Sequence, residues 1–99
     1  MNANISADES GRIRVAGPVT FSTAAALLHA GRPLLANKPD VTIDLGETTA
    51  VDSAGLALLL EWLRQARLAK QKLRFVALPE KLLAIARLSG VEGLLTAGD

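Results

Sequence analysis

The sequence predicts a single α/β domain in which helices pack against a mixed β-sheet. Short stretches of alternating polar and apolar residues, typical of strands with one buried face, occur three times along the chain. Each is followed by a longer apolar stretch with the capping and breaking residues of a helix. Such alternation favours parallel strands joined by right-handed crossovers. We expect one domain over residues 1–99, with residues 1–3 and 97–99 frayed.

The first strand of this alternation is expected at residues 12–16, where charged and apolar side chains alternate. Ile5 indicates an earlier strand that pairs with it across a turn at residues 9–11, and this antiparallel hairpin makes the predicted sheet mixed. Gly17 and Pro18 are expected to end the strand, because both residue types interrupt regular structure.

An alanine-rich helix is expected next, over residues 24–31. Ser22 or Thr23 can cap its start, and Gly31 can end it. Residues 34–36 either extend this helix or pack beneath it.

The central strand of the sheet is expected at residues 41–45, whose β-branched residues suit a pleated strand packed on helices. Residues 46–49 are interpreted as a turn that leads the chain to Asp52. Asp52 and Ser53 should therefore sit at the carboxyl end of this strand, which is the edge where open α/β sheets usually bind ligands and partners.

Residues 51–63 join this polar pair to a long apolar helix. Asp52 and Ser53 can both accept hydrogen bonds from the free N–H groups of a helix start, and we expect Ser53 at the N-cap or next to it. Gly55 has no side chain, so another backbone, a nucleotide or a partner protein can approach this helix end closely. Because capping residues are common, a well-capped helix without a further role is the simpler interpretation of this motif alone.

One face of this helix should lie on the sheet. Steps of about 100° from Leu56 place on that face Leu59, Leu60, Leu63 and Ala66. Leu58 and Trp62 project to the flank, and we interpret them as candidates for a partner surface. An equally open alternative is that Trp62 closes the edge of the core, because tryptophan is usually largely buried.

The last part of the chain predicts a strand at residues 72–76 and a helix over residues 80–88, with Pro79 as its first residue. The inner side of that helix is expected to consist of Leu82, Ile85, Ala86 and Ser89. Val91, Leu94 and Leu95 should then hold the tail against the domain.

Composition argues against several classes of partner. With 11 Lys+Arg and 10 Asp+Glu, the net charge of +1 provides no overall field that would attract nucleic acid or an anionic membrane. The chain contains no cysteine, and it shows neither a signal-peptide pattern nor an apolar run of the roughly 20 residues that span a bilayer. We therefore expect a cytoplasmic protein that does not bind nucleic acid.

The sequence offers little for catalysis. The phosphate-binding loop G-x-x-x-x-G-K-[ST] is missing. Ser53 as a nucleophile would need a neighbouring base, and the single histidine, His29, lies in the alanine-rich helix. One histidine, no cysteine and scattered carboxylates do not make a cluster of metal ligands. We expect a protein that is not an enzyme and that uses no cofactor or metal.

Several segments together resemble the STAS domains, the fold of bacterial anti-sigma-factor antagonists. The resemblance is carried by the strand at residues 41–45, by Val51-Asp52-Ser53-Ala54-Gly55-Leu56 with the helix after it, by Gly17-Pro18-Val19-Thr20-Phe21, and by residues 79–95. In an antagonist, it implies that Ser53, directly after Asp52, is the phosphorylated residue. Together with the flank of the helix, the expected partner surface consists of Asp52, Ser53, Ala54, Gly55, Leu58 and Trp62.

A narrower resemblance concerns residues 54–60, whose unbroken leucines are similar to the STAS subunit of the Mla transporter, an ABC system that moves phospholipids to keep the outer membrane asymmetric. Thr20, Ala54 and Ala57 stand where antagonists more often carry an aspartate, a Ser or Thr, and a glycine.

This resemblance implies a non-catalytic accessory subunit that binds the transporter's cytoplasmic ATPase. Such a subunit would reach the inner face of the inner membrane only through the complex. The alternative is an anti-sigma-factor antagonist that binds an anti-sigma factor kinase and is regulated by phosphorylation of Ser53.

Overall fold

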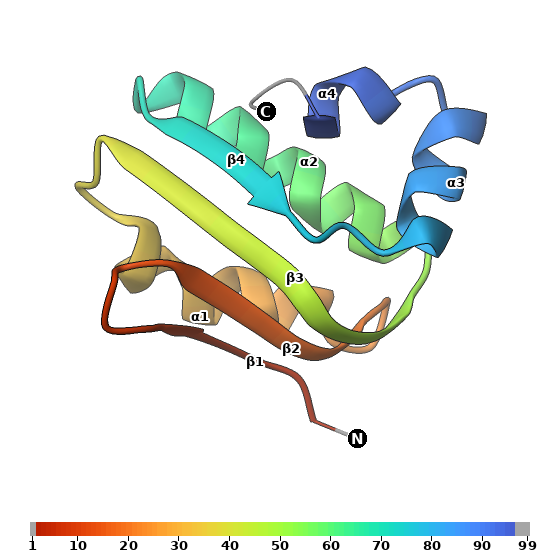
Figure 1. Ribbon diagram of the computed structural model, residues 1–99, viewed down its shortest axis with the longest axis horizontal. Coiled ribbons are helices and arrows are strands. Elements are labelled where there is room, and N and C mark those ends of the chain that lie inside the picture. Colours follow the sequence, from red (N-terminus) through yellow and green to blue (C-terminus); the bar gives the residue numbers. More distant parts are fainter. Residues whose placement is uncertain (1, 97–99) are drawn as a thin grey trace.

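A four-stranded sheet with helices packed against it forms the framework of the protein (Figure 1). The computed structural model describes residues 2–96. Along the chain the elements are β1 (Asn4–Ala7), β2 (Ile13–Val19), α1 (Ala24–Leu35), β3 (Asp40–Val51), α2 (Ser53–Leu68), β4 (Lys72–Val76), α3 (Glu80–Leu88) and α4 (Glu92–Thr96).

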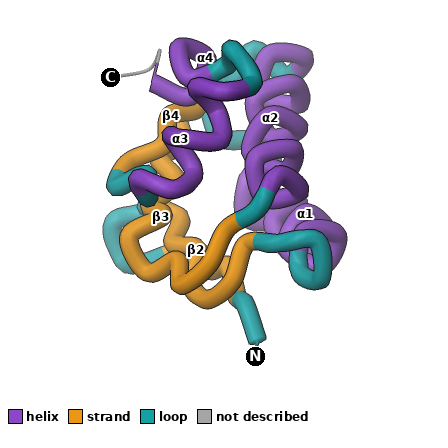
Figure 2. Tube along the Cα trace, turned by 90° about the vertical axis from the view of Figure 1, so that its right-hand side faces the viewer, coloured by secondary structure: helices purple, strands orange, loops and turns teal. Residues whose placement is uncertain are grey.

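The strands lie in the order β1-β2-β3-β4. β1 pairs antiparallel with β2, whereas β2, β3 and β4 run parallel to one another. The predicted mixed α/β sheet is therefore confirmed, and so is the central position of the strand that contains residues 41–45. Figure 2 shows α1 and α2 side by side on one face of this sheet. The alternating strand patterns explain this arrangement, because only one face of the sheet is apolar.

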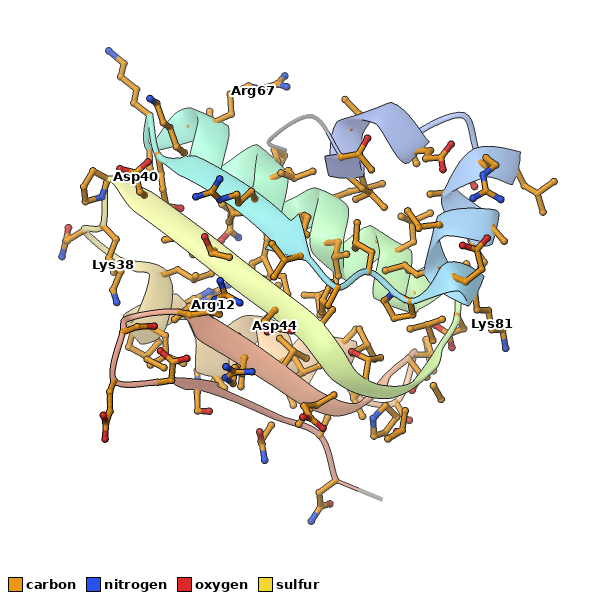
Figure 3. The ribbon with its side chains drawn as sticks, viewed as in Figure 1. Arg12, Lys38, Asp40, Asp44, Arg67 and Lys81 are labelled. Carbon is orange, nitrogen blue, oxygen red and sulfur yellow. The ribbon has the colours of Figure 1, made fainter. Side chains whose placement is uncertain are left out.

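The core lies between the sheet and these helices. Inward-facing side chains of β2, β3 and β4 are almost completely covered, among them Ile13, Ile43 and Phe75. The opposite face of the sheet is polar, and Figure 3 shows Arg12 and Asp44 on it. Arg12 Nη1 lies 3.5 Å from Asp44 Oδ2. Exposed ion pairs of this kind add little stability, so burial on the helical face dominates the energetics of the fold.

Gly17 and Pro18 do not end β2, contrary to the expectation from sequence. The strand continues to Val19 and stays paired with β3 through two shifts of register. Bulges accommodate proline, which lacks the N–H that a regular ladder needs. Gly17 adopts a φ of 89°, and a Cβ there would lie 2.6 Å from the carbonyl oxygen of Asn2.

The predicted turn at residues 46–49 is also part of a strand, so this expectation is wrong. β3 has 12 residues and ends only at Val51, and its polar part from Glu47 onwards is paired with β2. β3 pairs with β4 only as far as Asp44. Beyond that residue β3 is an edge strand, which can carry polar side chains in contact with water. Pairing with β2 therefore outweighs the turn-like composition of these residues.

Helix α1 continues past its expected end at Gly31 and runs to Leu35, which confirms the alternative that the following residues extend it. Gly31 is buried, and a Cβ on it would lie 3.5 Å from the indole ring of Trp62. The same Cβ would lie 3.3 Å from the side chain of Ile5, so Gly31 is a packed position inside α1 and does not end the helix. Thr23 is at the N-cap position, but its hydroxyl oxygen accepts a hydrogen bond from the Thr20 N–H and does not cap the helix.

The expectation that Leu58 and Trp62 lie on an uncovered flank of α2 is wrong. Their exposed fractions are 4% and 1%. Helix α1 lies against Trp62, and the periodicity of α2 alone could not locate that neighbouring helix. The alternative that Trp62 belongs to the core is correct, although its Nε1 has no hydrogen-bond partner within residues 2–96.

The face of α2 that was expected to lie on the sheet is confirmed in part. Leu59 and Ala66 are buried, whereas Leu60 and Leu63 are half-buried. The buried face of α2 therefore includes Leu58 and Trp62 in addition to Leu59 and Ala66. It is wider than the sheet alone would cover, because α1 packs beside α2.

The C-terminal elements agree with the expectation from sequence except in detail. β4 and α3 have the predicted bounds, but Pro79 is the N-cap of α3 and not its first residue. On the inner side of α3, Leu82 and Ala86 are buried and Ser89 is exposed.

The tail after α3 forms a short helix, α4, which the sequence did not predict. Of the residues expected to hold the tail, Leu95 is buried and Val91 packs against the core cluster. Leu94 is 50% exposed, so the expectation is wrong for this residue.

Of the residues expected to fray, Ala3 packs against the core cluster, while residues 1 and 97–99 lie outside the described part of the chain. None of the helices within residues 2–96 has the length and apolar character needed to cross a bilayer.

Replacing Trp62 tests its assignment to the core. We expect Trp62→Ala to lower the free energy of unfolding by about 3–5 kcal/mol, because a large buried ring is lost and a cavity remains. Trp62→Phe should cost less, because it keeps a ring and removes the buried, unpartnered N–H. Urea titrations followed by circular dichroism measure both variants, and Leu68→Ala, at an exposed position of the same helix, is the control. Unchanged stability of Trp62→Ala would show that the indole is not part of the core.

Candidate functional site

The junction between β3 and α2 forms an exposed corner of the molecule. Asp52 follows the last residue of β3 and is the N-cap of α2, and Ser53 is the first residue of that helix. The predicted position of both residues at the carboxyl end of the central strand is confirmed. Ser53 is exposed, whereas Asp52 and Ala54 are half-buried. The Ser53 hydroxyl is therefore accessible at the positive end of the α2 dipole.

The Asp52 carboxylate joins three backbone groups from two segments of the chain. Its Oδ1 accepts hydrogen bonds from the N–H groups of Ala54, at 2.9 Å, and Gly55, at 3.1 Å. Its Oδ2 accepts a hydrogen bond from the Phe21 N–H at 3.0 Å. The first two bonds are the helix cap that the sequence predicted. The third hydrogen bond connects the loop between β2 and α1 to the start of α2. No local sequence pattern predicts it, because the two residues are far apart in the chain.

The pKa of Asp52 lies below its ordinary value. The hydrogen bond from Phe21 is the largest cause, partial desolvation opposes it, and the bonds from Gly55 and Ala54 add to it. The positive charge of Lys81 lowers the pKa further. Figure 3 shows Lys81 of α3 beside the segment that leads from β3 into α2. The carboxylate is thus ionised at neutral pH, and the corner combines this negative charge with a lysine and a helix start.

Gly55 has a different role from the one expected. It is buried, and a Cβ on it would lie only 2.2 Å from the carbonyl oxygen of Val19 at the end of β2. The close approach that the sequence suggested therefore exists, but the approaching group is the protein's own backbone. The space next to Gly55 is not open to a nucleotide or a partner.

Phe21 completes the corner, and it was missed as a site residue in the sequence. Its side chain is 84% exposed, although its N–H is bonded to Asp52. This exposed aromatic ring gives the corner an apolar contact that Leu58 and Trp62, being buried, cannot supply. The available signal was a phenylalanine in a short polar loop, which has no core-facing partner in the local pattern.

The corner has the chemistry of a recognition surface. His29, the single imidazole, lies in the middle of α1. Within residues 2–96 no group of three His, Cys, Asp or Glu side chains is placed to hold a metal ion. The groups available at the corner are a hydroxyl, an ionised carboxylate, a lysine and an aromatic ring, which suit contacts with another protein.

A family model called STAS_2, described as Mlab, STAS domain, matches residues 3–96 of the chain. No curated protein sequence matches the chain significantly.

Solved structures share the fold. A crystal structure of Mglu has a TM-score of 0.59 and 23% sequence identity, and the match covers 78% of this chain and 19% of Mglu. This chain thus corresponds to about a fifth of the length of Mglu. The anti-sigma factor antagonist SpoIIAA in its unphosphorylated form has a TM-score of 0.55 and 12% identity, over 91% of this chain and 100% of SpoIIAA. At these identities the similarity concerns the fold.

The family match spans every residue of the strands and helices described above. It also includes the corner formed by Phe21, Asp52 and Ser53. The chain belongs to the STAS domain family described as Mlab.

Proposed function

We propose that this chain is a regulatory subunit that binds the cytoplasmic ATPase of an Mla-type phospholipid ABC transporter. Support comes from the family, whose description names Mlab, and from one structural observation. Phe21 and Ser53 are both exposed, on two segments that the Asp52 carboxylate joins. This surface, here called the Ser53 corner, comprises Phe21, Asp52, Ser53 and Lys81.

The Ser53 corner provides an anchor and a polar contact together. An aromatic ring that is 84% exposed loses much unfavourable contact with water when a partner covers it. Aromatic side chains of this kind are frequent hot spots of protein–protein binding. The hydroxyl of Ser53 and the charges of Asp52 and Lys81 then determine which partner fits, because unmatched polar groups are costly in an interface.

Phosphorylation of Ser53 would change this surface. The α2 dipole and Lys81 would favour the new charge locally, whereas the ionised Asp52 would repel it. A phosphate adds roughly −1.5 to −2 charges and three acceptor oxygens to a surface that must pack closely against the partner. Modification would therefore release the partner without unfolding the domain.

The second candidate function is that of an anti-sigma-factor antagonist. The observation that favours it is the exposed hydroxyl of Ser53 directly after the capping aspartate. Co-purification from native membranes and cytosol distinguishes the two functions. Recovery of an ABC ATPase with its permease supports the transporter subunit, whereas recovery of an anti-sigma factor kinase that phosphorylates Ser53 supports the antagonist and contradicts our proposal.

Phe21→Ala tests the anchor. We expect this change to weaken binding of the ATPase subunit by about thirtyfold, which corresponds to about 2 kcal/mol for an aromatic hot spot. The melting temperature should stay the same, because the Phe21 side chain is largely in water. Leu88→Ala, at a position of α3 with 92% exposure, is the control. Calorimetry measures the affinities. If both variants bind as tightly as the parent chain, Phe21 is not part of the binding surface.

Ser53→Glu tests the effect of charge at the corner. We expect this variant to bind the ATPase subunit more weakly than Ser53→Ala, because the carboxylate adds charge beside the ionised Asp52, whereas alanine loses only the hydroxyl. Ser6→Glu places the same charge on exposed β1 and should bind like the parent chain. If Ser53→Glu keeps full affinity, the hydroxyl lies outside the interface.

The pH dependence of stability tests the Asp52 clamp, the name used here for the three backbone hydrogen bonds that the Asp52 carboxylate accepts from Phe21, Ala54 and Gly55. The pKa of Asp52 is lowered in the folded protein, so the clamp stabilises the fold above the ordinary value of 3.8. This contribution is lost as the pH falls through the lower folded value. We therefore expect Asp52→Asn to be less stable than the parent chain near neutral pH, and the difference to shrink below about pH 3.8. Urea titrations across this range measure it, and a difference that does not vary with pH would exclude an ionised clamp.

A further inference from the structure

A groove lies at the end of the molecule opposite the Ser53 corner. It has a volume of about 910 Å³ and runs between α2, β4 and α4. Figure 3 shows Asp40 and Arg67, which border the groove, at one end of the molecule and Lys81 at the other. The groove therefore does not overlap with the Ser53 corner.

The floor of the groove is apolar. Leu60 and Leu63 of α2 and Leu73 of β4 are half-buried there. Leu94 of α4 borders the same space and is 50% exposed. Leu60, Leu63 and Leu73 pack on the core with one side and leave the other side in contact with water. A ligand that covered them would gain hydrophobic free energy of the order of 25 cal/mol per Å² of apolar surface.

The rim of the groove is basic. Arg67 of α2 and Lys72 and Arg74 of β4 are exposed and form no ion pair within residues 2–96. Arg74 donates from Nε to the hydroxyl oxygen of Thr42 at 3.2 Å, which leaves its other nitrogens available. Among the lining residues that the structure describes within 2–96, only Asp40 carries a carboxylate. The cationic excess calls for a ligand with several negative charges.

Arg64 also borders the groove, but Glu61 neutralises it. Arg64 Nε donates to Glu61 Oε1 at 2.8 Å, and Arg64 Nη2 donates to Glu61 Oε2 at 2.6 Å. The hydrogen bonds from Arg64 and Gln65 lower the pKa of Glu61 to about 2, so this pair stays ionised at neutral pH. The cations available to a ligand are therefore Arg67 on the α2 side of the groove and Lys72 and Arg74 on the β4 side.

An apolar floor could bind a second copy of the chain, a lipid or a polypeptide. The positions of the three cations favour one of these occupants over the others. A second copy of the chain would bring the same three cations against this rim, which is unfavourable. A lipid headgroup concentrates its charge at one point, whereas carboxylates along a polypeptide can reach cations on both rims. Carboxylate is also the group that guanidinium binds in two-point geometry.

β4 offers a further contact to an extended polypeptide. The Lys72 N–H donates to the Pro39 carbonyl at 2.8 Å, so the main-chain groups of Lys72 face β3. Because these groups alternate along a strand, those of Leu73 face away from β3. Leu73 is only half-buried, and its main chain lies at the outer edge of the sheet formed by residues 2–96, next to the groove.

We propose that this groove binds an extended acidic segment of a partner protein, in which apolar side chains alternate with carboxylates. The apolar side chains contact Leu60, Leu63 and Leu94, and the carboxylates bind Arg67, Lys72 and Arg74. The proposal is independent of the Ser53 corner, so either surface can fail its test without the other.

Fluorescence anisotropy with a labelled peptide of alternating leucine and glutamate tests the proposal on the intact chain. A peptide of the same length with lysine in place of glutamate is the matched probe. We expect the acidic peptide to bind and the basic one not to bind. Equal binding of both peptides, or binding of neither, would overturn the proposal.

Variants of the chain locate the site. We expect Lys72→Glu and Arg67→Glu each to weaken binding of the acidic peptide about tenfold or more, because each replaces an attraction with a repulsion. Lys38→Glu carries the same change of charge outside the groove lining and should bind within about twofold of the parent chain. An equal loss in Lys38→Glu would show that only the overall charge matters, and would overturn the assignment to the groove.

The apolar floor is tested by Leu94→Ser, with Leu88→Ser as the matched control at an exposed leucine outside the groove. Only Leu94→Ser should weaken peptide binding, and circular dichroism confirms that both variants remain folded. Flotation with phosphatidylglycerol vesicles and sedimentation of the chain alone test the other occupants. Vesicle binding that displaces the peptide, or a dimer that Leu94→Ser dissociates, would overturn the proposal in favour of a lipid or of a second copy.

Discussion

The carboxylate of Asp52 accepts backbone hydrogen bonds from two separate segments, and the exposed corner depends on it. One oxygen caps α2, and the other holds the loop at Phe21. At the same corner the carbonyl of Val19 lies against Gly55, where any side chain would collide with it. The glycine lets the end of β2 come close to α2, and the carboxylate then satisfies N–H groups at a helix start that is only partly in water. Ser53 and Phe21 are positioned by these two constraints together.

The distribution of charge matters more for this domain than its sum. A net charge of +1 predicts no long-range attraction to any partner. Cations nevertheless gather where β4 and the end of α2 border the groove, while carboxylates pair with arginines on the open face of the sheet. Ser53 and Arg67 are separated by 14 residues of one helix, or about 21 Å along its axis. Ser53 and Arg67 therefore lie at opposite ends of α2.

Much of the fold was predictable because its signals are local. β4 and α3 were found with their bounds, since strand alternation, a proline before a helix and a glycine after it act within a few residues of chain. The errors share a different cause. Gly17 and Pro18 looked like a break, and residues 46–49 looked like a turn, but each segment pairs with the other across the sheet. No window of sequence contains both partners of that pairing.

The sequence by itself determined the α/β class, the order of the elements from β1 to α3 and the position of Asp52 and Ser53 at a helix start, because periodicity and capping follow from neighbouring residues. Only the tertiary structure decided which side chains remain in water around that start. Trp62 became part of the core because α1 packs on it at Gly31, and Phe21 became the exposed ring because a distant carboxylate holds its backbone. Burial depends on what the rest of the chain places against a residue, and the residue's own pattern cannot contain that information.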